Sequence, residues 1–453
     1  MDITLKIADG GELGLSAIKN GDGKSYRLIN LADKKSYMYL KIDNNKFKII
    51  EKDDIIIDEE DVLESKLDEL LLAVIEGEQS GIEGGKDEDV DENPYDPDKI
   101  RVDTRNFSLK NIYDMIENGD IDLSPDFQRY FVWDNTRQSR LIESILLRIP
   151  LPMFYFAQDD DGRITVVDGL QRLSTIKKFM DNNLALKNLE YLDKCEGKYY
   201  GKPREDDMII DAKYFRWFNM TQIVVNVIDP QSPPKVKYDI FRRINTGGKP
   251  LNWQEIRNCL SKPYIRKLLI DMAGLGSFSS ATLGSIKDTR MEAQELALRF
   301  IVFHDYYYNS SLDGYSGNMV SSLDLKIEEL NKRDKESVNS YVSLFDKAMQ
   351  NAEYLFGRYA FRKCLIEHIE DPNSRKQLIN KALFISWSVL LSQYDVDKIK
   401  AGNEAGILAK PLAENITNSQ EFFNFLTYGT NARANINAAF HVAQEIIETN
   451  LKY

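Results

Sequence analysis

The chain has 453 residues, of which 43% are apolar, enough for two or three domains with ordinary cores. It has no run of about 18 apolar residues and no secretory signal at its N-terminus, so we expect a cytoplasmic protein without a membrane span. The net charge of −13 lies entirely in residues 1–100, which hold 26 Asp and Glu against 13 Lys and Arg. The remaining residues are neutral in sum, which is compatible with a basic face on the main body.

Residues 1–76 are predicted to form a small acidic β-rich domain with a closing helix. Short β-type runs at 3–7, 26–29, 37–42 and 47–50 are separated by turn signals. An apolar stripe with helical spacing follows: Leu63, Leu67, Leu70, Leu71 and Val74. Residues 77–99 are Gly-rich and acidic, a composition typical of a flexible linker.

Residues 100–258 alternate predicted helices and strands, which is typical of an α/β domain. Ser108 is expected to cap a helix that runs through Ile116, and a second helix covers about 136–148. Strands are predicted at 153–156, 164–167 and 223–228. Residues 259–453 show long helical patterns, so the predicted fold class is α+β with a C-terminal α-helical lobe.

The three cysteines, Cys195, Cys259 and Cys364, are widely separated and include no C-x-x-C pair. This spacing favours free thiols over a disulfide framework or a zinc site.

The most informative segment is 164–174, in which a β-branched run breaks at a glycine and continues with helical spacing. The turn therefore lies at a helix N-terminus, where unpaired backbone N–H groups and the helix dipole favour an anion. Arg172, in the first helical turn, adds a guanidinium suited to phosphate. Asp168 supplies a carboxylate for a metal ion or a water molecule. We therefore predict a phosphate-handling site at Asp168, Gly169 and Arg172.

Two further segments are candidate parts of the same site. Their proposed nucleotide-binding residues, together with Gly169, are Gln128, Arg129, Asn245, Gly247, Gly248 and Lys249. Paired glycines allow a ligand to approach the backbone closely, and an Asn amide can bond a base, ribose or phosphate. Each segment also has a structural interpretation. Arg129 could stack on Trp133 at the surface, the glycines could form a helix-entry turn, and Gln254-Glu255 could cap the next helix.

The motifs in this order resemble the GmrSD-type restriction endonuclease N-terminal family, which has a ParB/sulfiredoxin-like core. The four that carry the resemblance are P-D-F-Q-R before a Trp, R-x-x-R-L-I-E-S-I-L-x-x-I-P-L-P, V-V-D-G-x-Q-R-L and F-x-x-I-N-T-G-G-x-x-L-x-x-Q-E-I-R-N. The resemblance covers roughly residues 100–450 and leaves the 1–76 domain outside.

This resemblance implies a nucleotide-hydrolysing or DNA-cleaving module of bacterial defence against phage. The family's catalytic D-G-Q-Q-R motif corresponds to Asp168, Gly169, Gln171 and Arg172, with Leu170 in place of the usual Gln. Many relatives end in an HNH-type nuclease domain. The three histidines of this chain, at 304, 368 and 441, form no such arrangement in the sequence.

Three functional hypotheses follow. The leading one is an NTPase-type restriction protein coupled to recognition or cleavage of foreign DNA, in which Asp168, Gln171 and Arg172 are catalytic. Mg²⁺ or another divalent cation is expected at Asp168, and DNA and a nucleotide are the expected partners. The second hypothesis is a metal-dependent DNA nickase that uses the same groups. The third is a non-catalytic ParB-like nucleotide switch that recruits a separate nuclease subunit. Homo-oligomerisation is left open.

The acidic 1–76 domain suggests a separate regulatory hypothesis. Its charge could occupy a basic face of the main body until DNA displaces it. The alternative is an ordinary acidic recognition or dimerisation module.

Overall fold

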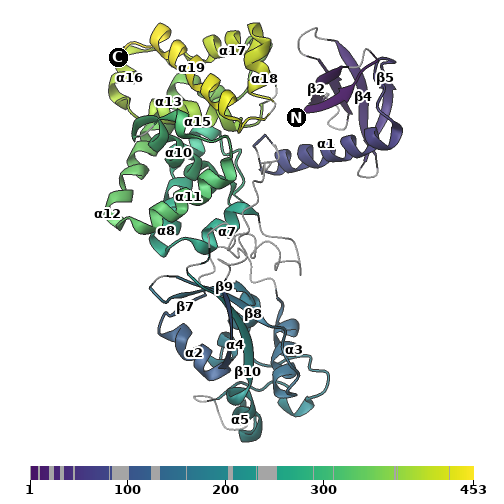
Figure 1. The fold of residues 1–453 in the computed structure, drawn as a ribbon, viewed down its shortest axis with the longest axis vertical. Coiled ribbons are helices and arrows are strands. Elements are labelled where there is room, and N and C mark those ends of the chain that lie inside the picture. The colour runs from purple at the N-terminus through teal and green to yellow at the C-terminus, as the bar shows by residue number, and fades with distance from the viewer. Residues whose placement is uncertain are drawn as a thin grey trace. The chain divides into compact units, whose positions relative to one another are not determined.

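The computed structural model describes residues 2–8, 11–19, 25–30, 35–43, 46–80, 82–83, 101–123, 133–159, 161–201, 208–230, 232, 252–288, 290–309, 311–371, 374, 376–427 and 429–453. The chain divides into two units, one formed by Met1–Val90 with Pro263–Tyr453 and the other by Asp91–Lys262 (Figure 1). We call Asp91–Lys262 the α/β unit and the helices of Pro263–Tyr453 the helical lobe. The mixture of sheets and helices confirms the predicted α+β class.

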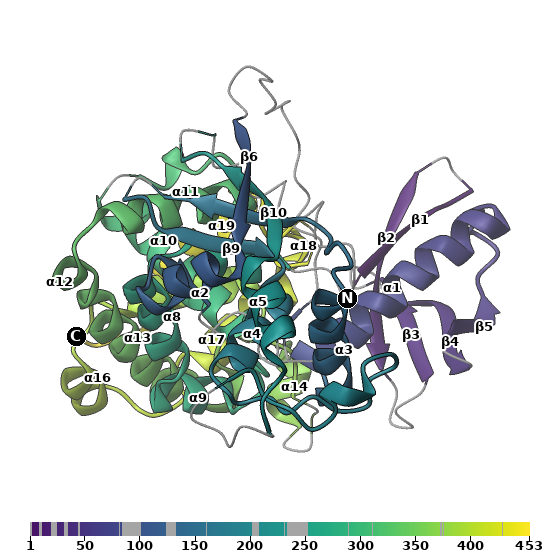
Figure 2. The same cartoon turned by 90° about the horizontal axis from the view of Figure 1, so that it is seen from below.

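The N-terminal region is an antiparallel sheet with the strands in sequence order. Its strands are β1 (Asp2–Lys6), β2 (Glu12–Lys19), β3 (Ser25–Ile29), β4 (Ser36–Asp43) and β5 (Lys46–Lys52). Helix α1 (Glu60–Ser80) contacts β1 and β5 and lies along the sheet (Figure 2). The predicted stripe of α1 is buried against the strand residues Leu5, Leu28 and Met38. Strand β2 was not predicted, because Gly14 and Ser16 interrupt its apolar pattern.

The predicted linker 77–99 lies mostly outside the described residues. Helix α1 extends to Ser80, and Ile82 and Glu83 pack against the helical lobe. The Glu83 N–H donates to the carbonyl of Ile379, and its carboxylate accepts from Asn380 at 2.5 Å. These two residues are therefore part of a folded contact.

The α/β unit is built on a five-stranded mixed sheet in the order β6-β10-β8-β9-β7. Its elements are β6 (Val102–Ser108), α2 (Leu109–Glu117), β7 (Ile121–Asp122), α3 (Asn135–Leu146), β8 (Phe154–Gln158), β9 (Ile164–Asp168), α4 (Leu170–Met180), α5 (Ala212–Met220), β10 (Gln222–Ile228) and α7 (Trp253–Leu260). Strand β10 runs parallel to β8, and β9 runs antiparallel to β8.

Local sequence explains most of these boundaries. Ser108 accepts a hydrogen bond from the N–H of Asn111 and caps α2 as predicted, and Asp134 caps α3 through the N–H of Arg137. Alternate residues of β8 and β10, such as Phe154, are buried. Strand β6 was missed because most of its side chains are exposed and show no apolar alternation.

The helical lobe accounts for the long helical patterns. Its helices are α8 (Pro263–Ala273), α9 (Gly276–Thr282), α10 (Glu292–Asn309), α11 (Met319–Lys332), α12 (Lys335–Val338), α13 (Ser340–Phe356), α14 (Ile366–Glu370), α15 (Lys381–Leu391), α16 (Val396–Gly402), α17 (Ala409–Asn418), α18 (Gln420–Phe425) and α19 (Arg433–Asn450). Helix α15 contacts α10, α13 and α19, and Trp387 is fully buried there. In the described part of the chain, no helix is long and apolar enough to cross a membrane. The three cysteines are free thiols, as predicted, and the structure shows that all three are buried.

A buried carboxylate, Asp305 on α10, organises one side of this lobe. The Tyr341 hydroxyl donates to both of its oxygens at 2.7 and 2.8 Å, and the ammonium of Lys326 lies 3.0 Å from Oδ2. The guanidinium of Arg333 lies 3.3 Å from Oδ2, and the Asn309 amide donates to Oδ1 at 3.1 Å. The carboxylate is therefore surrounded by hydrogen-bond donors on every side that the structure describes.

Candidate functional site

The predicted turn between strand and helix is present at the end of β9. Strand β9 ends at Asp168, Gly169 is the N-cap of α4, and α4 begins at Leu170. Gly169 has φ +100°, a left-handed conformation that disfavours any side chain. A Cβ atom at this position would lie 2.2 Å from Cδ1 of Phe154. Only glycine fits this close approach of β8 to the turn.

Asp168, at the end of β9, forms an ion pair with Arg172 in the first turn of α4. The Nη2 atom of Arg172 lies 2.8 Å from Oδ2 of Asp168. The same guanidinium donates to the carbonyls of Pro152 and Met153, the latter at 3.2 Å, and lies 4.0 Å from the ring centre of Phe154. Arg172 is therefore held by two backbone carbonyls, one carboxylate and one aromatic ring.

The two partners differ in exposure. The side chain of Arg172 is 11% exposed and that of Asp168 is 35% exposed. Burial lowers the pKa of Arg172, whereas the carboxylate of Asp168 opposes this shift. Arginine nevertheless stays protonated in proteins, so the pair remains ionic. Asp168 thus presents a carboxylate to solvent from a fixed position.

The N-terminus of α4 has the features of an anion site. Gly169 has no side chain to accept from the first N–H groups of the helix, and no side-chain cap is formed. Lys177 and Lys178 lie in the last turn, where they complement the negative end of the dipole. The positive end of α4 therefore lies beside the carboxylate of Asp168 without a capping carboxylate or hydroxyl.

A polar row across the sheet leads away from Asp168. In the strand register, Asp168 pairs with Tyr155, Tyr155 with Asn226, and Asn226 with Thr104, so all four side chains share one face. The Thr104 hydroxyl donates to Oδ1 of Asn226 at 2.8 Å. Tyr155 and Asn226 were not predicted as site residues from the sequence, although each is a polar position alternating with buried apolar neighbours.

Residues 109–261, about a third of the chain, match the family described as GmrSD restriction endonuclease, N-terminal domain. The predicted resemblance to this family is confirmed over this segment. The match supports a restriction-type defence protein. It ends before the helical lobe, so the proposed likeness of that region stays a prediction. Neither the curated proteins nor the solved structures contain a match to the chain.

Within the GmrSD-type domain, the departure at Leu170 has a simple structural explanation. Leu170 is 5% exposed and belongs to the buried face of α4 with Leu173 and Ile176. An apolar residue is therefore well suited to this position. Gln171 is half-buried next to it.

The second motif of the GmrSD-type domain has a structural carboxylate. Glu143 on α3 is buried and accepts hydrogen bonds from the backbone N–H groups of Glu190, Tyr191 and Leu192. It therefore fixes the 190–192 loop.

The other predicted nucleotide-binding residues lie outside the described residues: Gln128, Arg129, Asn245, Gly247, Gly248 and Lys249. Their roles stay predictions. Trp133, the suggested partner of Arg129, has the guanidinium of Arg137 at 4.5 Å from its ring centre.

Helix α7, at the end of the GmrSD-type domain, contacts β9 and contains an unexpected residue. Asn252 and Glu255 form the capping box, so the predicted capping by Glu255 is confirmed. Gln254 is only 1% exposed, and neither polar atom of its amide has a hydrogen-bond partner among the described residues. Burial of an unpaired amide is costly, which makes Gln254 a residue worth testing.

Metal binding would depend on few protein ligands. The described residues contain no cluster of three or more His, Cys, Asp or Glu side chains suited to a metal ion. Asp168 would therefore offer a single carboxylate. This donor set fits Mg²⁺, which usually keeps several waters and binds through one or two carboxylates plus substrate phosphates.

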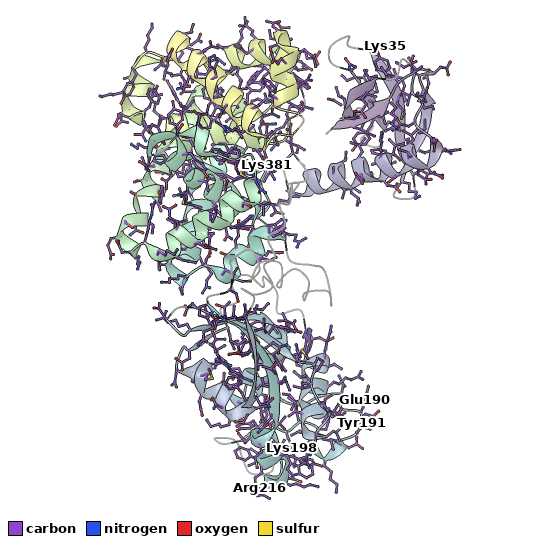
Figure 3. The ribbon with its side chains drawn as sticks, in the orientation of Figure 1. Lys35, Glu190, Tyr191, Lys198, Arg216 and Lys381 are labelled. Atoms are coloured by element: carbon purple, nitrogen blue, oxygen red, sulfur yellow. The ribbon has the colours of Figure 1, made fainter. Side chains whose placement is uncertain are left out.

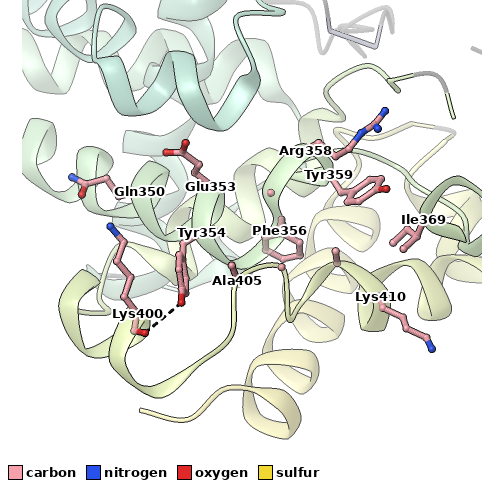
Figure 4. A pocket seen from close by; sticks show the side chains of 13 residues that line it. Gln350, Glu353, Tyr354, Phe356, Arg358, Tyr359, Ile369, Lys400, Ala405 and Lys410 are labelled. Atoms are coloured by element: carbon pink, nitrogen blue, oxygen red, sulfur yellow. Dashed lines mark hydrogen bonds between the residues drawn. The ribbon is translucent and has the colours of Figure 1, made fainter. Parts of the chain in front are cut away.

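A cavity of about 670 Å³ lies in the helical lobe (Figure 4). Its lining includes Tyr354, Arg358, Lys400 and Lys410, and the Tyr354 hydroxyl donates to the carbonyl of Lys400 at 3.3 Å. None of the predicted site residues lines this cavity.

Proposed function

We propose that the GmrSD-type domain binds and hydrolyses a nucleoside triphosphate at the N-terminus of α4, and that hydrolysis is coupled to recognition or cleavage of foreign DNA. The observation that supports this most directly is the solvent-accessible carboxylate of Asp168, which Arg172 holds at 2.8 Å beside an uncapped helix N-terminus. Phosphate binds readily at such a terminus. A fixed carboxylate next to phosphate is suited to orienting the attacking water.

Each residue has a distinct role in this proposal. The backbone N–H groups at the start of α4 bind phosphate oxygens, and Asp168 orients water through the oxygen that faces solvent. Arg172 positions Asp168 and the 152–153 backbone, because its donors already engage these groups. A divalent cation bound at Asp168 would supply charge neutralisation for the phosphates. Gln171, Arg129 and Lys249 complete the proposed phosphate contacts.

We infer that the polar row contacts the rest of the nucleotide. Tyr155 and Asn226 lie on the same sheet face as Asp168, and their uncharged donors and acceptors suit a ribose or a base. We therefore place the sugar and base over β8 and β10, with the phosphates toward α4.

The test is hydrolysis of each of the four NTPs with Mg²⁺, with and without phage DNA, by the wild type, Asp168→Ala and Arg172→Ala. Loss of a charged group from the site should reduce the rate by about 10²–10³. Circular dichroism checks that both variants stay folded. Hydrolysis at the wild-type rate by both folded variants would contradict the proposal.

The family description as a restriction endonuclease favours a second candidate, direct DNA nicking by the same groups. This candidate predicts that the wild type converts supercoiled plasmid to open circles in the presence of Mg²⁺. Asp168→Ala should lose this nicking, and the wild type should show no NTP turnover. Nucleotide binding without turnover or nicking would instead select a switch that recruits a separate nuclease.

A further inference from the structure

Helix α5 carries an exposed basic and aromatic stripe in the α/β unit. Lys213, Arg216, Trp217 and Met220 are spaced i, i+3, i+4 and i+7, so they lie along one side of the helix. Lys213 and Arg216 are exposed, and Met220 is 77% exposed. Phe218, which is fully buried, marks the opposite, core-facing side. We call these four residues the α5 stripe.

Cations are gathered around Trp217 of the α5 stripe. The ammonium of Lys213 lies 4.4 Å from the indole ring centre, and the guanidinium of Arg148, which follows α3, lies 5.6 Å from it. Such contacts hold long cationic side chains in place at an exposed site. The indole therefore pre-organises two positive charges beside Arg216, which lies at the α5 end of the unit (Figure 3).

The cations of the α5 stripe have no acidic ion-pair partner among the residues that the structure describes. Helix α5 contains no acidic residue, and the preceding Asp211 pairs with Lys198 at 2.9 Å. Lys213 and Arg216 form no ion pair within the described part of the chain. Cations left unpaired on an exposed surface are suited to a polyanion, whose phosphates they contact with release of counterions.

The α5 stripe and the Asp168 site lie toward the same end of the sheet. Helix α5 ends at Met220 and β10 begins at Gln222, while Asp168 is paired through Tyr155 with Asn226. Asn226 is four residues along β10 from Gln222, or about 13 Å at the usual rise of a strand. The junction between α5 and β10 therefore lies at the same end of the sheet as Asp168.

We propose that the α5 stripe, with Arg148, binds the phosphate backbone of duplex DNA. The proposal rests on the DNA partner of the proposed function and assigns it a place in the fold. The contacts are to phosphates and therefore independent of base sequence. Trp217 acts by holding the cations, because both cations already lie against its ring.

The experiment measures binding of a fluorescent DNA duplex to the full chain over a series of salt concentrations. Lys213→Glu/Arg216→Glu should weaken binding by about tenfold or more, and the slope of log K against log salt should fall by about 2. The matched control is Lys400→Glu/Lys410→Glu, which makes the same charge change at two exposed lysines of the helical lobe. This control should retain the affinity and salt slope of the wild type.

Three results would overturn the inference: equal weakening by both double variants, unchanged binding by the stripe variant, or tighter binding to an RNA duplex of the same sequence. NTP hydrolysis without DNA, measured on the same proteins, separates this inference from the proposed function. The stripe variant should keep the wild-type basal rate. If no protein hydrolyses NTP but DNA binding still depends on the stripe, only the hydrolysis proposal fails.

Discussion

Asp305 and Asp168 both have basic partners, but their surroundings differ. Asp305 in the helical lobe is 8% exposed and receives contacts from Tyr341, Lys326, Arg333 and Asn309. Asp168 in the α/β unit is 35% exposed, and its described side-chain partner is Arg172. The carboxylate of Asp305 is thus fully engaged by neighbouring donors. The carboxylate of Asp168 has one described side-chain partner and is partly exposed to solvent.

This difference separates structural from candidate functional carboxylates. A buried carboxylate whose oxygens are all engaged stabilises the elements that contribute the donors. A carboxylate fixed on one side keeps an oxygen for a ligand or a water. We therefore expect substitutions at Asp305 to change stability and substitutions at Asp168 to change activity.

Replacement of Asp305 should have the largest effect on stability. Asp305→Ala removes the buried acceptor of the Tyr341 hydroxyl and leaves Glu329 as the carboxylate partner of Lys326 and Arg333, and should lower the free energy of unfolding by on the order of 3 kcal/mol. Urea denaturation followed by circular dichroism measures this loss. Asp168→Ala is the comparison and should lose less, because its carboxylate is partly solvated and the guanidinium of Arg172 keeps its two carbonyl partners. Equal losses in the two variants would remove the distinction.

Gly169 provides the next test. Gly169→Ala combines a left-handed backbone with a Cβ contact to Phe154, so we expect a loss of about 2 kcal/mol together with reduced NTP turnover. Gly197→Ala is the control. Gly197 also has positive φ, but a Cβ there meets nothing within 4 Å. If both variants behave alike, backbone strain accounts for the effect and the close approach to β8 does not.

Acid should destabilise the helical lobe through Asp305. Burial alone would raise the pKa of this carboxyl, but the nearby imidazole of His304, the hydrogen bond from Tyr341 and the charge of Lys326 outweigh it and lower the pKa well below its usual value. The carboxylate therefore contributes stability that is complete above about pH 4 and is lost as the pH falls further. The unfolding free energy of the wild type should fall there by up to about 1.4 kcal/mol per pH unit from this group. Asp305→Asn should show a shallower slope, and an unchanged slope would contradict the assignment.

The smallest expected effect concerns Gln254. Gln254→Met replaces an unpaired buried amide with an apolar side chain of similar length, and should raise the unfolding free energy by about 1 kcal/mol. Chemical denaturation measures the change. A variant that instead loses nucleotide binding would show that the amide contacts the ligand.

The sequence predicted the strand–glycine–helix turn at Gly169 better than the elements around it. The turn at Gly169 was visible because a β-branched run, a glycine and helical spacing follow one another locally. The contacts of Arg172 with the carbonyls of Pro152 and Met153 depend on β8 lying beside β9, which local patterns do not encode. Strand β6 shows no alternation of apolar and polar residues. Most apolar side chains of α5 lie toward solvent instead of the core, so neither element was predicted. The donors around Asp305 come from helices far apart in the sequence, and no motif marks them.

The most direct measurement is NTP hydrolysis by Asp168→Asn and Asp305→Asn, each normalised to the folded fraction at a temperature where both are folded. Asp168→Asn should lose about 10²–10³ in rate, and Asp305→Asn should keep the wild-type rate. Full activity in folded Asp168→Asn, or an equal loss in Asp305→Asn, would contradict the assignment of Asp168 as the carboxylate that acts on the nucleotide.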